Sequence, residues 1–158
     1  MPHLLEYQVP PGKRMHNSEE FVLAPATFRF TLASVAKAFE RLVARVDALA
    51  PVAIGRGDRL ERDRAVRCLA ELRRLDPLAD ITSACPEAVA NDLSYVLGDR
   101  FQAEVVSATC HVCAATHGKG ELVTGEWEAT WDGYGSGGST LSCPRKHVLH
   151  ARVQWTVD

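Results

Sequence analysis

The spacing of three cysteines and one histidine near the C-terminus constrains this 158-residue chain more than any other feature. One pair of cysteines has two residues between its members, and after 29 intervening residues a cysteine and a histidine follow with three residues between them. The four residues are Cys110, Cys113, Cys143 and His147. Thiolates at this spacing can point from one tight turn toward a single ion, and a second turn can complete a tetrahedron. The pattern predicts a metal site that joins two distant segments.

The donor atoms favour Zn²⁺ over other ions. Zn²⁺ prefers a mixture of thiolate and imidazole ligands, and a structural site needs no open position. His150 is the alternative to His147 as fourth ligand, but three intervening residues keep His147 within the turn that Cys143 opens. The cysteine count of five is odd, and the N-terminus lacks the features of a signal peptide. Both observations favour reduced thiols, metal ligation and a cytoplasmic location.

Both turns resemble those of zinc ribbons and of rubredoxin-type knuckles, whose second turn often reads Cys-Pro, as Cys143 and Pro144 do here. The resemblance covers about residues 106–157 and rests on ligand spacing and on the strands expected beside each turn. It implies a β-sheet module that zinc holds together. The chain departs from the usual pattern at Lys146, where a fourth cysteine commonly stands, so the last ligand is a histidine.

The hydrophobic pattern predicts helices first and strands afterwards. Apolar residues at alternating spacings of four and three predict a helix over residues 32–49. Asp58 is the expected N-cap of a second helix, and a third is expected to open at Thr82 or Ser83. From residue 101 onward, alternating apolar and polar residues predict antiparallel strands. The glycine-rich residues 132–140 are expected to form a flexible loop.

We therefore expect an α+β protein in which an N-terminal three-helix part packs with a small C-terminal antiparallel, zinc-stabilised β-sheet. The expected parts are an extended N-terminal arm (residues 1–24), a helical part (25–100) and a zinc-ribbon-like β module (101–158). The last two parts are expected to form one compact unit. No apolar run approaches the roughly 18 residues that span a bilayer, so no membrane association is expected.

The sequence predicts a non-enzymatic zinc-binding adaptor or regulatory protein. A net charge of −2 gives no global attraction to nucleic acid, so a protein partner is favoured and nucleic acid is the second class considered. The candidate partner-binding residues are basic and are Arg59, Arg67, Arg74, Arg145 and Lys146.

The alternative function is a zinc-dependent hydrolase or transferase with an open coordination position. In that interpretation His111 or His150 carries a proton, and the glycine-rich residues 132–140 form a lid. Zinc deaminases need a glutamate two residues after a metal ligand, and no ligand in this chain has one. The alternative therefore has less support from the residues than the binding role.

Overall fold

The computed structural model describes residues 3–9, 23–76, 81–131 and 133–157. Most of the arm predicted over residues 1–24 lies outside the described residues. The chain divides into two compact units. The first comprises Met1–Tyr7 and Phe30–Glu104, and the second comprises Gln8–Arg29 and Val105–Asp158. Each unit is thus built from two segments that are separated in the sequence.

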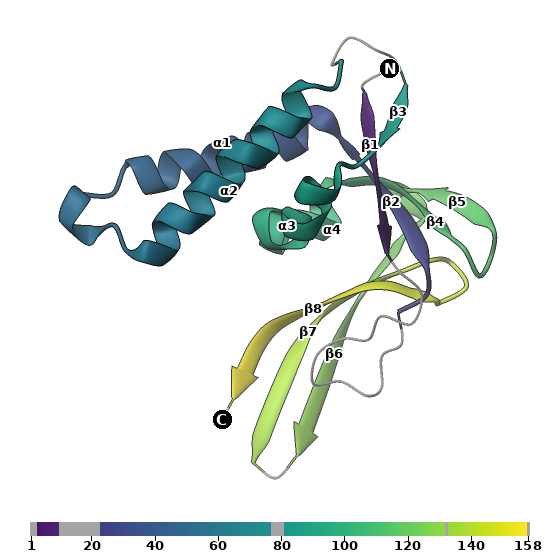
Figure 1. Cartoon of the computed structure of the whole chain (residues 1–158). Coiled ribbons are helices and arrows are strands. Elements are labelled where there is room, and N and C mark those ends of the chain that lie inside the picture. Colours follow the sequence, from purple (N-terminus) through teal and green to yellow (C-terminus); the bar gives the residue numbers. More distant parts are fainter. Residues whose placement is uncertain (1–2, 10–22, 77–80, 132, 158) are drawn as a thin grey trace. The chain divides into compact units, whose positions relative to one another are not determined.

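Strands precede, separate and follow the helices (Figure 1). In chain order the elements are β1 (Leu4–Val9), β2 (Ala26–Thr31), α1 (Leu32–Asp47), η1 (Pro51–Ala53), α2 (Arg56–Arg73), β3 (Thr82–Ala84), α3 (Glu87–Leu97), η2 (Gly98–Arg100), α4 (Phe101–Glu104), β4 (Val105–Cys110), β5 (Ala115–Gly118), η3 (Lys119–Glu121), β6 (Val123–Trp131), β7 (Tyr134–Ser142) and β8 (Val148–Val157). The described strands form a five-stranded sheet with the order β3-β1-β2-β4-β5 and a three-stranded sheet with the order β6-β7-β8.

The predicted arrangement of the fold is wrong, although the mixture of helices and strands fits the α+β class. Strands β1, β2 and β3 lie before and between the helices, so the N-terminal part is not built from helices alone. Strands β1 and β3 pair in parallel, with Leu5 opposite Ser83. The C-terminal strands are divided between two sheets, and the predicted metal ligands lie beside strands of both. A single small C-terminal sheet stabilised by zinc is therefore not what this chain forms.

The helices of the first unit begin where local hydrogen bonds favour them. The side-chain oxygen of Thr31 accepts a hydrogen bond from the backbone N–H of Ser34 at 3.2 Å and caps α1, which occupies most of the predicted range. Asp58 lies inside the first turn of α2 and accepts a hydrogen bond from the backbone N–H of Gly55 at 3.0 Å. Gly55, rather than Asp58, is therefore the N-cap. The third helix begins at Glu87, because residues 82–84 pair with β1 instead.

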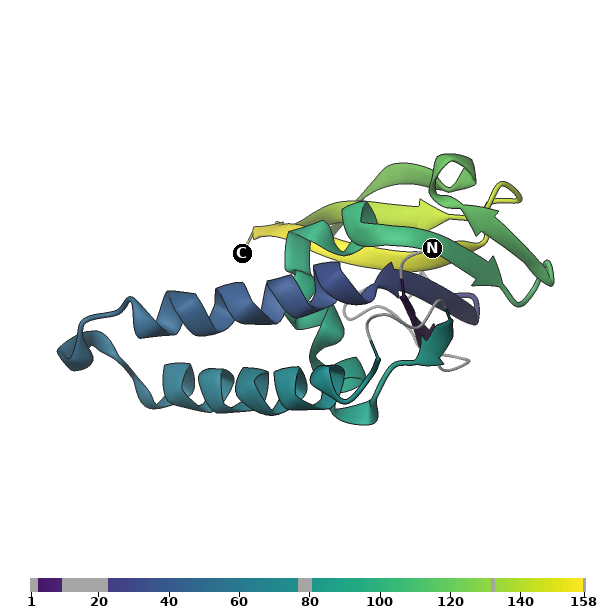
Figure 2. The ribbon, with the colours of Figure 1, turned by 90° about the horizontal axis from the view of Figure 1, so that it is seen from above.

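The core of the first unit contains aromatic side chains near the strands. Phe101 packs edge-on against Phe30 and Tyr7, with ring centroids 5.0 Å and 6.1 Å apart. Helices α1 and α2 run side by side in both views (Figures 1 and 2). An ion pair between Arg62 and Asp47 joins them at 2.6 Å, but it is exposed and so contributes little to stability. Apolar burial therefore holds this unit together.

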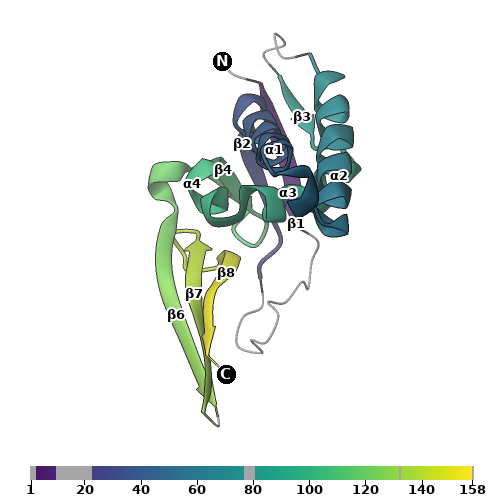
Figure 3. The same ribbon diagram turned by 90° about the vertical axis from the view of Figure 1, so that its left-hand side faces the viewer.

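Of the glycine-rich residues expected to form a loop, residues 134–140 lie instead in the central strand of the three-stranded sheet (Figure 3), Gly133 is in a turn, and residue 132 lies outside the described residues. Strand β7 pairs with β6 from Tyr134 opposite Trp131 to Ser142 opposite Val123, and with β8 on its other side. A β-carbon at Gly138 would lie 1.7 Å from the carbonyl oxygen of Arg152. The absence of a side chain thus allows the backbone of β8 to approach closely.

Candidate metal centre

Two turns of the second unit carry the predicted metal ligands. In the first turn (residues 110–113), Cys110 is the last residue of β4, and Cys113 lies in the connection to β5. In the second turn (residues 143–147), Cys143 directly follows β7, and His147 directly precedes β8. Each turn joins two strands of one sheet, and because β4 and β7 belong to different sheets, the ligand cluster brings strand ends of both sheets together.

The four ligand atoms lie within 4.8 Å of one another. The Sγ atoms of Cys113 and Cys143 are 3.8 Å apart, and His147 Nδ1 lies 3.6, 3.2 and 3.3 Å from the Sγ atoms of Cys110, Cys113 and Cys143. A tetrahedral zinc ion with ordinary bond lengths separates two sulfurs by about 3.8 Å, and sulfur from nitrogen by about 3.6 Å. The four ligand atoms therefore lie close enough together to surround one ion of about this size, and this cluster can hold a metal.

Backbone geometry keeps both turns tight. Ala114, directly after Cys113, and Lys146, directly before His147, have positive φ angles of 54° and 69°. In the second turn, the Lys146 N–H donates to the carbonyl oxygen of Cys143 at 2.8 Å, and the Cys143 N–H donates to that of His147 at 3.0 Å. Left-handed conformations at residues other than glycine are costly and occur most often where function requires them. Both residues lie next to a predicted ligand. The turns therefore hold the ligand side chains in position at a cost in backbone conformational energy.

The pKa values of the Cys113 and Cys143 thiols are shifted in opposite directions. Burial, together with the neighbouring sulfurs of Cys110 and Cys143, raises the pKa of the Cys113 thiol to about 11. Burial also acts to raise the pKa of Cys143, but hydrogen bonds from the backbone N–H groups of His147 and Arg145 outweigh it and lower that pKa to about 7. A cation that binds here therefore has to displace a proton from Cys113, whereas Cys143 gives up its proton readily.

A segment that the sequence did not indicate fixes the position of both turns. The carbonyl oxygen of Pro25 accepts a hydrogen bond from the His111 N–H at 3.0 Å, and the Ala24 N–H donates to the carbonyl oxygen of Val148 at 2.8 Å. The hydroxyl of Thr27, which is buried, lies 2.8 Å from Nε2 of His111. Residues 24–27 therefore lie against the first turn and against the start of β8. Only tertiary structure brings them there, so no sequence signal could have found them.

The remaining candidate residues are not among the clustered ligands. His150 is on β8, where its ring packs edge-on against Phe28 at 6.2 Å, so it is not among the clustered ligands. Arg145 and Lys146 are exposed beside the cluster in the second turn. The other basic candidates, Arg59, Arg67 and Arg74, are exposed on α2 or at its end.

Comparisons of the chain with protein families, with curated protein sequences and with solved structures gave no match. The zinc-ribbon resemblance therefore rests on the ligand residues alone. Among the described residues, no helix is both long enough and apolar enough to cross a membrane.

Proposed function

We propose that Cys110, Cys113, Cys143 and His147 hold one Zn²⁺ ion in a structural site. The observation that carries this proposal is the spacing of the four ligand atoms, which matches a tetrahedron of the size that zinc requires. Cys110 and Cys143 are 0 % exposed, whereas Cys113 and His147 are half-buried, so the cluster is partly shielded from water. Three thiolates and one imidazole suit zinc better than magnesium or calcium, which prefer oxygen ligands.

The identity of the fourth ligand can be tested with Co²⁺ as a spectroscopic substitute for zinc. Wild type and His150→Ala are expected to show the strong visible absorption of tetrahedral cobalt with sulfur ligands, because neither lacks a proposed ligand. His147→Ala is expected to bind Co²⁺ at least about tenfold more weakly, because one of four bonds is lost. A cobalt spectrum that changes in His150→Ala and not in His147→Ala would reverse the assignment.

A complete ligand set favours a binding role for the protein over catalysis. A catalytic zinc site commonly has three protein ligands and leaves one position for water or substrate. Here the chain supplies a fourth ligand at zinc-binding distance, and His150 packs against Phe28 instead of facing the cluster. The hydrolase or transferase alternative would require one of the four ligands to leave the ion. We therefore favour a non-enzymatic adaptor or regulatory protein in the cytosol, where thiols stay reduced.

The surface beside the metal turns has the composition of a protein-binding site. Val112, in the first turn, is 58 % exposed, and Arg145 and Lys146 in the second turn are exposed as well. An exposed apolar side chain beside cationic ones suits a partner with an acidic, partly apolar surface. Several arginines near α2 already have acidic neighbours, such as Arg74 with Glu71 at 3.1 Å. This pairing lowers the positive charge that α2 could offer to nucleic acid.

Two double variants, one beside the metal turns and one on α2, test which surface binds a partner. A protein captured by the zinc-loaded chain is expected to bind a Val112→Ser and Arg145→Glu double variant at least about tenfold more weakly, because both contacts are lost. A double variant with Arg59→Glu and Arg67→Glu on α2 is expected to bind as wild type does. Zinc content is measured in each variant as the control. The proposal would be contradicted if only the α2 variant lost binding to the partner protein. Salt-sensitive binding of an oligonucleotide to the chain would also contradict it.

A further inference from the structure

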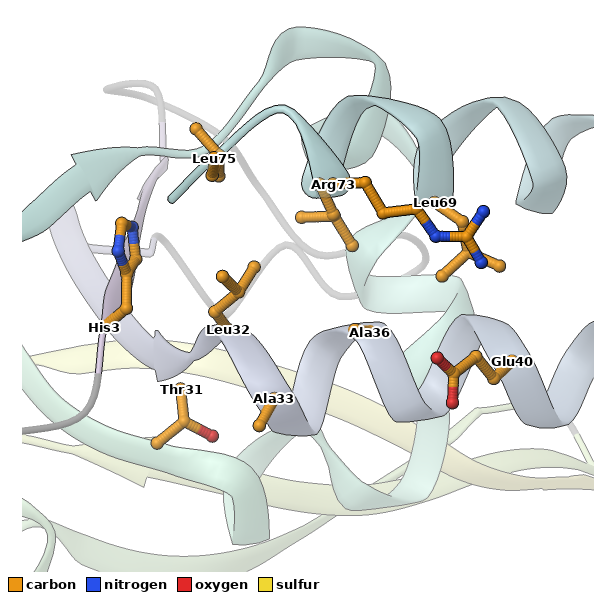
Figure 4. Close-up of a pocket in the computed structure, with 10 residues that line it drawn as sticks. His3, Thr31, Leu32, Ala33, Ala36, Glu40, Leu69, Arg73 and Leu75 are labelled. Carbon is orange, nitrogen blue, oxygen red and sulfur yellow. The ribbon is translucent and has the colours of Figure 1, made fainter. Parts of the chain in front are cut away.

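The first unit contains a pocket of about 360 Å³ between α1, the end of α2 and the residue before β1. Its walls are mostly aliphatic, with Leu32 and Ala36 on one side and Leu69 and Leu75 on the other (Figure 4), and Leu72 lines it as well. A volume of this size is within the usual range for small-molecule sites. It holds about a dozen non-hydrogen atoms if each takes up the roughly 30 Å³ of a water molecule.

His3 closes one end of this pocket and has no polar partner there. Only 5 % of the residue is exposed, and neither ring nitrogen has a hydrogen bond within the described part of the chain. Figure 4 shows its ring between Thr31 and Leu75. The hydroxyl of Thr31 is already bonded to Ser34, so it does not satisfy the imidazole. A buried polar group without a partner is costly, which indicates that a ligand supplies one.

The charges around the pocket favour an anionic group at the His3 end. His3 lies beside the N-terminus of α1, since its carbonyl oxygen accepts the N–H of Leu32 at 2.9 Å, and the first turn of α1 has no acidic residue. A helix N-terminus attracts negative charge, and an imidazole N–H can donate to a carboxylate. At the other end, the charges of Arg73 and Glu40 have opposite signs and are exposed (Figure 4). The end of the pocket beside Arg73 and Glu40 therefore favours neither an anionic nor a cationic group of a ligand.

We infer that this pocket binds an unbranched aliphatic monocarboxylate of about eight to ten carbon atoms. The carboxylate accepts a hydrogen bond from the imidazole of His3, and the hydrocarbon chain lies between Ala36, Leu69 and Leu72. The inference is independent of the metal site, because the pocket residues belong to the first unit and the metal ligands to the second.

The test is calorimetric binding of sodium octanoate to the zinc-loaded full chain, with octan-1-ol as a probe of the same chain length and no charge. We expect octanoate to bind with a Kd below about 1 mM and octanol to bind at least tenfold more weakly. On octanoate addition, NMR signals of the His3 ring are expected to shift. If octanol binds as tightly as octanoate, the carboxylate assignment is wrong. If neither probe binds, or if the His3 signals do not move, the pocket assignment is wrong.

Three substitutions make the test specific. His3→Phe keeps the size of the ring and removes its nitrogens, so it should raise the melting temperature of the unliganded protein by a few degrees and abolish the preference for octanoate. Ala36→Phe fills the pocket and should reduce octanoate binding more than tenfold. Ala44→Phe, at an exposed position of α1 outside the pocket, should bind as wild type does.

Ala33→Leu provides a milder way to narrow the pocket if Ala36→Phe does not fold, because Ala33 lines the pocket and is itself exposed. It is expected to weaken octanoate binding several-fold with an unchanged melting temperature. Equal octanoate affinity in wild type, His3→Phe and Ala33→Leu would overturn the inference.

Discussion

Replacing Cys110 with serine is expected to abolish tight metal binding and to lower the stability of the chain. Cys110 is fully buried at the end of β4, and its Sγ atom is one of four that converge on the proposed ion. Loss of one of the three thiolates should weaken binding by more than about 1,000-fold. At a metal concentration about 1,000 times the wild-type Kd, a bound ion adds about 4 kcal/mol to the free energy of unfolding. Its loss should lower the melting temperature by on the order of 10 °C.

Cys85→Ser is the matched control for this prediction. Cys85 lies in the first unit, outside the ligand cluster, and burial raises the pKa of its thiol to about 12. Its replacement should leave one equivalent of bound metal. A chelator should lower the melting temperature of wild type and of Cys85→Ser, but should leave that of Cys110→Ser unchanged. A Cys110→Ser protein that still binds one equivalent of metal with wild-type affinity would show that the ligand set is wrong.

Gly138→Ala is expected to destabilise the three-stranded sheet. The added β-carbon would lie 1.7 Å from the carbonyl oxygen of Arg152 and 2.9 Å from Nε1 of Trp127. The first of these atoms belongs to the backbone of β8, so it cannot move aside without disturbing the strand pairing. We expect the free energy of unfolding, measured by urea denaturation, to fall by about 3 kcal/mol or more.

The control is the same substitution at Gly57. This residue lies in α2, and a β-carbon there would have no atom within 4 Å. Gly57→Ala should therefore raise the free energy of unfolding by about 0.5 kcal/mol, because alanine favours helix. If both substitutions had the same effect, Gly138 would not lie in a closely packed central strand.

The sequence carried the information on the metal ligands because that information is short-range. Two residues between Cys110 and Cys113, and three between Cys143 and His147, limit where the side chains can point. The structure then brings the two turns together. Helix α1 could be predicted for a similar reason, because its apolar stripe has the period of a helix over the whole element.

The features that could not be predicted depend on contacts between distant residues. Strand β3 has three residues, too few for a periodic signal, and it forms by pairing with β1. In β7 the glycines remove the alternation of apolar side chains that marks a strand, and the close approach of β8 explains Gly138. His3 belongs to the segment that was expected to form an extended N-terminal arm. It is buried beside the start of α1, whose first N–H bonds to its carbonyl oxygen.

X-ray absorption at the zinc edge of the purified protein tests the central claim most directly. The account predicts one zinc ion per chain, with three sulfur neighbours at about 2.3 Å and one nitrogen neighbour at about 2.0 Å. A protein that takes up no zinc, or a zinc ion with fewer than three sulfur neighbours and an oxygen from water in their place, would contradict it.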